Sequence, residues 1–235
     1  MKYNILTVAN EDYAPFIKLF VNSLFEFIDT TNVNKIYIFD TGLSQDTLKY
    51  LNYFPQVEVK ETEISAPSSQ IHDEGWQKNT YSKTKFLLST LEETGLPTLM
   101  IDSDSIFFSN FEDLIDWNSD VAVCNRNREG FSKHIGSFFG AINVTNSIKF
   151  LKKWIQNISE LQKEGNLKHC ESPALSKTIL EEQGFTISEL EENLVSAVFP
   201  DNNSRIYHLK SDYYAKTIES RLRLPHAVQF CQRYL

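Results

Sequence analysis

Apolar runs and helix-spaced apolar positions alternate along the N-terminal half of the chain. The pattern predicts strands at 5–8, 35–39 and 57–59, and helices at 14–27 and 45–53. The first helix rests on apolar residues spaced three or four apart, namely Phe16, Phe20, Leu24 and Phe27. Because a strand–helix–strand order implies right-handed crossovers, this half predicts a parallel sheet with helices on its faces.

The most apolar of the predicted strands is 98–101, which is therefore expected near the centre of the sheet. A polar stretch at 65–75 reads as a loop, and a helix follows at 78–94 until Gly95 and Pro97 end it. A strongly polar sequence, starting at Asp102, comes directly after the apolar strand.

The second half mixes strands and helices. Strands are predicted at 121–124, 138–144, 195–199 and 205–209, and helices at 147–161, at 171–182 and in the tail after Ser211. No repeat, low-complexity tract or linker divides the chain of 235 residues. The prediction is one α/β domain over 1–235, with a mostly parallel central sheet flanked by helices and a small mixed C-terminal extension.

Composition narrows the class of partner. Hydrophobic residues make up 41% of the chain, with 17 Phe and 10 Tyr, which is ample for a buried core. The net charge of −8, without a long basic run, argues against nucleic acid as the main partner, because affinity for phosphate backbones comes from clustered Lys and Arg. A small anionic ligand held through a metal is compatible with this balance.

Cysteine usage and hydropathy indicate a cytoplasmic protein. Cys124, Cys170 and Cys231 are widely spaced and form no C-x-x-C pair, as expected of free thiols in a reducing compartment. No signal-like segment precedes the first strand, and no window approaches the roughly 18 apolar residues that a membrane span requires.

The chemistry of the chain centres on Asp102 and Asp104, which flank Ser103 at the end of the apolar strand. In open α/β sheets, ligands bind beyond the carboxyl ends of the strands, and Mg²⁺ or Mn²⁺ prefers carboxylate oxygens that leave room for substrate phosphates. The alternative is a chance pair, since Asp is a common turn residue after any strand. The buried strand before the pair and the apolar run at 106–108 after it favour the metal site.

The segment 99–106, with 111–114 downstream, resembles the D-x-D segment of GT-A-fold glycosyltransferases, in particular the family-8-like nucleotide-diphospho-sugar transferases. The resemblance covers 3–210 as an order of elements, although only the D-x-D segment is sharply diagnostic. It implies a GT-A (Rossmann-like) fold with a nucleotide-binding half at 1–120 and an acceptor or catalytic half at 121–235. It also implies Mn²⁺ or Mg²⁺ dependence, a nucleotide-sugar donor with UDP as the leading nucleotide, transfer of a hexose, and a glycan or other hydroxyl acceptor.

The same resemblance assigns a donor site. Ala9, Asn10 and Tyr13 match the loop that contacts the nucleotide base and ribose, although a helix-entry loop capped by Asp12 fits the residues equally.

A basic pair, Lys83 and Lys85, lies where related enzymes present a cation to the donor, with a solvated helix face as the alternative. Ser103 and Lys210, which adjoin the predicted metal ligands, are assigned to the same donor site.

Two further positions of the predicted site are a metal ligand and an acceptor-side glycine. His208 resembles the C-terminal His that supplies a third metal ligand, and neutral imidazole suits Mn²⁺ better than Mg²⁺. Gly140 resembles the acceptor-side position that makes room for the sugar, unless it only permits close strand packing.

Glu171 and Ser172 stand where family-8 enzymes commonly carry Asp-Gln. Glu171 is then a general base of an inverting reaction, a stabiliser in a retaining one, or only the acidic first turn of a helix. With Asp104, which holds the leaving group through the metal, it makes up the predicted catalytic pair.

Three other functions are alternatives to a glycosyltransferase, and the first two fit the sequence poorly. A D-x-D phosphohydrolase of the haloacid-dehalogenase kind places its motif on the first strand, whereas this pair lies mid-chain. A nucleotidyltransferase needs a Gly-rich basic loop after the first strand, where this chain has an acidic sequence starting at Asn10. A catalytically silent nucleotide-sugar-binding module stays open, because the Asp-Gln pair is replaced.

Overall fold

The computed structural model describes residues 1–64, 74–165, 170–210 and 220–221. Cys231, the tail predicted after Ser211 and most of the predicted 65–75 loop lie outside these residues. Among the described helices, none has the length and apolar character to cross a membrane.

A seven-stranded sheet forms the centre of the molecule, in the order β3-β2-β1-β4-β7-β6-β8. Its strands are β1 Tyr3–Ala9, β2 Val33–Asp40, β3 Val57–Glu61, β4 Thr98–Ile101, β6 Val121–Asn125, β7 His134–Ala141 and β8 Ile187–Glu191. β7 runs antiparallel to β4 and β6, and the other neighbouring pairs are parallel. The predicted α/β class and the central position of strand 98–101 are confirmed.

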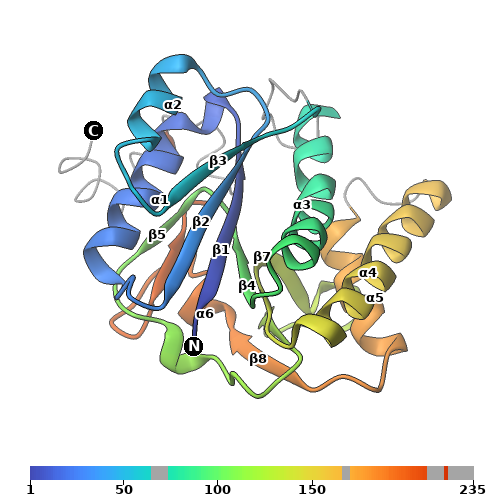
Figure 1. Cartoon of the computed structure of the whole chain (residues 1–235). Coiled ribbons are helices and arrows are strands. Elements are labelled where there is room, and N and C mark those ends of the chain that lie inside the picture. The colour runs from blue at the N-terminus through green and yellow to red at the C-terminus, as the bar shows by residue number, and fades with distance from the viewer. Residues whose placement is uncertain (65–73, 166–169, 211–219, 222–235) are drawn as a thin grey trace.

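Helices cover both faces of the sheet (Figure 1). One face carries α1 Ala14–Phe27, α2 Gln45–Leu51 and a small second sheet of β5 Ser105–Phe107 with β9 Ile206–His208; the other carries α3 Glu74–Thr94, α4 Val144–Glu164 and α5 Glu171–Glu181. Alternation along β1 supplies both layers, because Ile5 packs with the α1 side and Leu6 with the α3–α4 side.

Most predicted elements are confirmed within a few residues, and α1 has the predicted bounds. Ser44 caps α2, its side chain accepting a hydrogen bond from the Thr47 amide. The boundary of β7 differs, because Asn143 caps α4 and the helix begins at Val144.

The strand predicted at 195–199 is wrong. Val195 ends a short helix, α6 Glu192–Val195, and Ala197 forms only an isolated bridge with Tyr207. The pattern also missed β5, which has three residues, and β8, in which Glu189 and Glu191 interrupt the apolar positions.

The topology collects several strand ends at one edge of the main sheet. The carboxyl ends of β1, β2 and β4 lie there because these strands are parallel. The first residues of β7 join them because β7 is reversed, and the Asp102 amide donates to the Ser137 carbonyl at 2.9 Å. The side chains that follow these ends form the candidate site.

Candidate active site

Asp102, Asp104 and His208 form a group whose ligand atoms all lie within 4.8 Å of one another. The two aspartates come from the turn between β4 and β5, and His208 is the last residue of β9. Antiparallel pairing of β5 with β9 sets Ser105 opposite His208, and so carries the imidazole to the aspartates from a distant part of the sequence. The D-x-D pair and the predicted C-terminal His are thus brought together.

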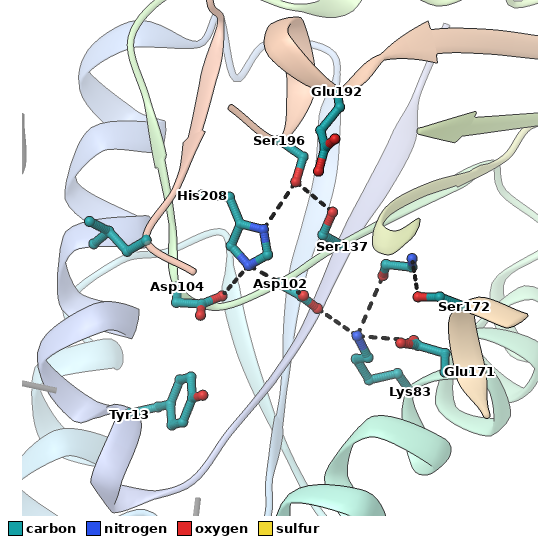
Figure 2. Close-up of polar contacts among 12 residues, drawn as sticks. Tyr13, Lys83, Asp102, Asp104, Ser137, Glu171, Ser172, Glu192, Ser196 and His208 are labelled. Carbon is teal, nitrogen blue, oxygen red and sulfur yellow. Dashed lines mark hydrogen bonds and ion pairs between the residues drawn. The ribbon is translucent and has the colours of Figure 1, made fainter. Parts of the chain in front are cut away.

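The imidazole of His208 is held by hydroxyl groups on its far side (Figure 2). Its Nδ1 lies 3.0 Å from Ser196 Oγ, which in turn lies 2.7 Å from Ser137 Oγ. The other ring nitrogen, Nε2, lies 3.1 Å from Asp104 Oδ1 and 3.7 Å from Asp102 Oδ2. A fixed ring with one nitrogen aimed at two carboxylates fits a divalent cation.

Asp104 is only 7% exposed, and both of its carboxylate oxygens have partners. Oδ1 faces His208 and Oδ2 pairs with Nη2 of Arg221. Burial by itself would raise the pKa of Asp104, but His208 and Arg221 outweigh it and hold the pKa well below its usual range. Asp104 is therefore ionised, as a metal ligand has to be.

Lys83, on α3, links the metal-site aspartate to the predicted catalytic glutamate. Its ammonium lies 2.6 Å from Asp102 Oδ1, 3.0 Å from Glu171 Oε1 and 3.4 Å from the Gly136 carbonyl oxygen. Burial alone would lower the pKa of Lys83, but the two carboxylates raise it above its ordinary value. Lys83 is a charged positioning group between these carboxylates.

Glu171 is the first residue of α5 and is buried against β7. Burial raises the pKa of its carboxyl to about 7, against the opposing effect of Lys83. Space for the carboxyl comes from Gly136, where a Cβ would lie 2.6 Å from Glu171 Cδ. The Trp154 indole also donates to the Glu171 carbonyl at 3.0 Å, which fixes the start of α5.

The predicted nucleotide loop follows β1 at the same edge. Ala9 ends β1, and Asn10 caps a short 3₁₀ helix, Glu11–Tyr13, by accepting a hydrogen bond from the Tyr13 amide at 3.3 Å. Asn10 thus caps the 3₁₀ turn, and α1 begins after Tyr13 without a side-chain cap, so Asp12 is the N-cap of neither. The Tyr13 hydroxyl accepts from Arg221 Nη1 at 3.3 Å, so the loop is in contact with the metal-site cluster.

Two other predicted residues, Ser103 and Lys210, lie near the Asp102–Asp104–His208 group. Ser103 is buried between the two aspartates. Burial, followed by the charge of Arg126, lowers the pKa of Lys210 to about 8, while the aspartates Asp102 and Asp104 oppose this shift. Lys210 therefore lies within electrostatic range of the cluster.

Two predictions are corrected by the geometry. Lys85 is exposed, and two residues along a helix lie about 200° apart around its axis, so Lys85 cannot share the direction of Lys83. Gly140 lies inside the sheet, where a Cβ would be 3.0 Å from Ala122 Cβ. The glycine that faces the site is Gly136, not Gly140.

Sequence reasoning missed four groups that build the site: Gly136, Ser137, Ser196 and Arg221. Ser137 and Ser196 act through His208, and no short motif marks such residues. Gly136 could have been found only if β7 had been predicted to begin at His134.

Comparisons with known proteins give the fold and no family. No known family profile and no curated protein matches the sequence. Among solved structures, an active-site mutant of LgtC matches with a TM-score of 0.70 and 13% identity, over 97% of this chain and 94% of that one. The galactosyltransferase LgtC in complex with donor and acceptor sugar analogues matches with a TM-score of 0.68 and 11% identity, over 98% and 96%. The chain therefore has the α/β fold of LgtC, as the resemblance to GT-A enzymes implied.

Proposed function

We propose that this chain is a metal-dependent glycosyltransferase that moves a hexose from a nucleotide-diphosphate sugar, with UDP as the nucleotide, to a hydroxyl group of a glycan or other acceptor. The observation that carries the proposal is the Asp102–Asp104–His208 group at the carboxyl edge of a sheet with the fold of LgtC. A metal ion held in this position would contact the diphosphate of a nucleotide bound over the same edge of the sheet.

The donor is held from both sides of that edge. Ala9, Asn10 and Tyr13 lie where the nucleoside would bind, after β1, and Ser103 and Lys210 adjoin the metal ligands. The Tyr13 ring lies 5.3 Å from that of Phe16 at an interplanar angle of 58°, and this contact fixes the position of the tyrosine.

Asp102, Asp104 and His208 would hold the cation, and a bound divalent cation would offset the charge that gathers on the departing diphosphate oxygen. Lys83 holds one oxygen of the Asp102 carboxylate, Oδ1, while the other oxygen, Oδ2, faces His208. Ser196 fixes the imidazole so that Nε2 stays directed at the aspartates.

Glu171 serves the acceptor side. As the acceptor oxygen attacks the anomeric carbon and the bond to the diphosphate breaks, the hydroxyl proton passes to the Glu171 carboxylate. A pKa of about 7 suits such a base near neutral pH. Lys83, 3.0 Å away, fixes the position of the carboxylate.

Thermal unfolding with a panel of nucleoside diphosphates, each with Mn²⁺ and with EDTA, tests the proposal. Ligand at about 100 times its dissociation constant stabilises by roughly 2.7 kcal/mol, or about 5–10 °C for a chain of this size. We expect a shift with UDP that requires Mn²⁺.

The variant D104N should lose that shift, because it removes a charged metal ligand. The control D113N changes an exposed aspartate that lies 3.7 Å from Arg205 and should keep the shift. A full shift in D104N would contradict the metal site. Nucleotide binding without sugar transfer or donor hydrolysis would instead indicate the silent binding module.

A further inference from the structure

Arg221 is a buried cation in the middle of the candidate site. It is 3% exposed, and each nitrogen of its guanidinium has an acceptor. Nη2 pairs with Asp104 Oδ2, Nε donates to the Leu209 carbonyl, and Nη1 donates to the Tyr13 hydroxyl at 3.3 Å. The guanidinium also lies over the Phe16 ring, with its central carbon 4.5 Å from the ring centroid.

This arrangement conflicts with metal binding by Asp104. One oxygen of the carboxylate faces His208 Nε2 at 3.1 Å, and the other carries Arg221. A divalent cation would need one of these oxygens, and it would then share a buried carboxylate with a fixed positive charge. Repulsion between two such cations is strong where water is excluded.

We infer that Arg221 competes with the metal for Asp104 in the free protein, and that the diphosphate of the donor relieves the competition by binding the guanidinium. The inference rests on the proposed function, and it assigns to Arg221 a role in coupling the metal to the donor.

The position of Arg221 supports the diphosphate as its second partner. Arg221 touches Tyr13, in the proposed nucleoside loop, and Asp104, in the proposed metal site. A diphosphate that joins a nucleoside to a metal must run between those two places. Guanidinium groups match phosphate oxygens through paired hydrogen bonds, so Arg221 can exchange a carboxylate for a phosphate without losing its charge partner.

A thermodynamic consequence follows. If the diphosphate removes Arg221 from Asp104, UDP raises the affinity for Mn²⁺, and Mn²⁺ raises the affinity for UDP by the same factor. Direct contact between metal and phosphate gives part of this coupling in any such enzyme. The part that passes through Arg221 disappears when its charge is removed.

The test is a titration of the full chain with Mn²⁺, without and with saturating UDP. Electron paramagnetic resonance measures the concentration of free Mn²⁺ at each point and so gives the affinity. For R221Q we expect affinity for Mn²⁺ alone to rise by about tenfold, affinity for UDP in the presence of Mn²⁺ to fall, and the coupling to shrink. The control R205Q removes a half-buried arginine beside Asp113, away from the Asp102–Asp104–His208 group, and should match the wild type in all three.

A second variant, R221K, shows whether an effect of R221Q comes from the lost charge or from misfolding. R221K keeps the positive charge but not the paired donors, so its Mn²⁺ affinity should stay near that of the wild type while its UDP affinity falls. Unchanged or weaker Mn²⁺ binding in folded R221Q would overturn the inference and leave the proposed function standing. Failure of the wild-type protein to bind Mn²⁺ or UDP would overturn both.

Discussion

At the scale of single residues, the site balances a small number of buried charges against one another. Lys83 pairs with Asp102 and Glu171, and Arg221 pairs with Asp104. Each carboxylate thus contacts a counter-charge, as buried ions require, and Lys83 is shared between two of them. Removing one partner therefore changes the behaviour of the other, and this makes the charges testable one at a time.

Ser196 offers a test of the imidazole without touching a metal ligand. The variant S196A removes the hydroxyl that lies 3.0 Å from His208 Nδ1, so the ring loses its fixed orientation. Loss of such a partner typically lowers metal affinity by about 10–100-fold, and we expect that range for Mn²⁺ measured by calorimetry. The exposed S132A is the matched control. Equal Mn²⁺ affinity in S196A and S132A would show that the hydroxyl does not orient the ligand.

Glu171 predicts a pH dependence of stability. Its pKa is raised by burial to about 7 from an ordinary value of 4.5, so the folded state binds the proton more tightly than the unfolded state. The contribution of the Glu171 carboxyl to the free energy of unfolding is complete below pH 4.5 and is lost as the pH rises through about 7.

The variant E171Q cannot ionise and avoids that loss. In urea unfolding with EDTA, the free energy of unfolding of E171Q relative to wild type should rise between pH 5 and 8, with the exposed E129Q as control. Lys83, Asp102 and Lys210 are the charged groups that act on Glu171. A constant difference across this range would mean that Glu171 is ionised throughout.

At the scale of elements, the reversed strand β7 decides what surrounds Glu171. Because β7 is antiparallel to β4, its first residues and not its last lie at the site edge. The two glycines of β7 consequently have separate roles: Gly136 gives room to the Glu171 carboxyl, and Gly140 gives room to Ala122 and Leu99 inside the sheet.

Alanine at each glycine separates these roles. G136A places a Cβ 2.6 Å from Glu171 Cδ, which should displace the carboxyl and lower turnover by about a hundredfold, as expected for misplacement near 1 Å. G140A should cost about 1–3 kcal/mol of stability by overpacking, with turnover unchanged in the folded fraction. Turnover assays and urea unfolding of both variants check this. The reverse pattern would assign the acceptor side to Gly140 after all.

At the scale of the whole molecule, local pattern explains the N-terminal half better than the second half. The strands and helices through β4 follow from apolar spacing and caps such as Ser44, because each depends on neighbours in sequence. Spacing does not reveal the direction of a strand, so the reversal of β7 was missed and with it Gly136. The resemblance of 139–143 to an acceptor-side strand then pointed to Gly140, which lies inside the sheet, and not to Gly136, which lies against Glu171.

The site itself was predictable where a motif carries its own chemistry. Asp102 and Asp104 stand out on sequence grounds, and His208 follows from the family resemblance. Arg221 has no such signal, because its contacts with Asp104 and Tyr13 arise only when the C-terminal part of the chain meets the D-x-D turn. Long-range pairing of this kind depends on the fold as a whole.

The pairing of β5 with β9 also has a consequence for synthesis of the protein. The ribosome completes the aspartate turn long before it adds His208, and Arg221 comes later still. A nascent chain that ends before β9 therefore offers two carboxylates without the imidazole, and it lacks the guanidinium that would compete for them. The proposed metal site is therefore complete only when β9 has emerged and docked beside β5.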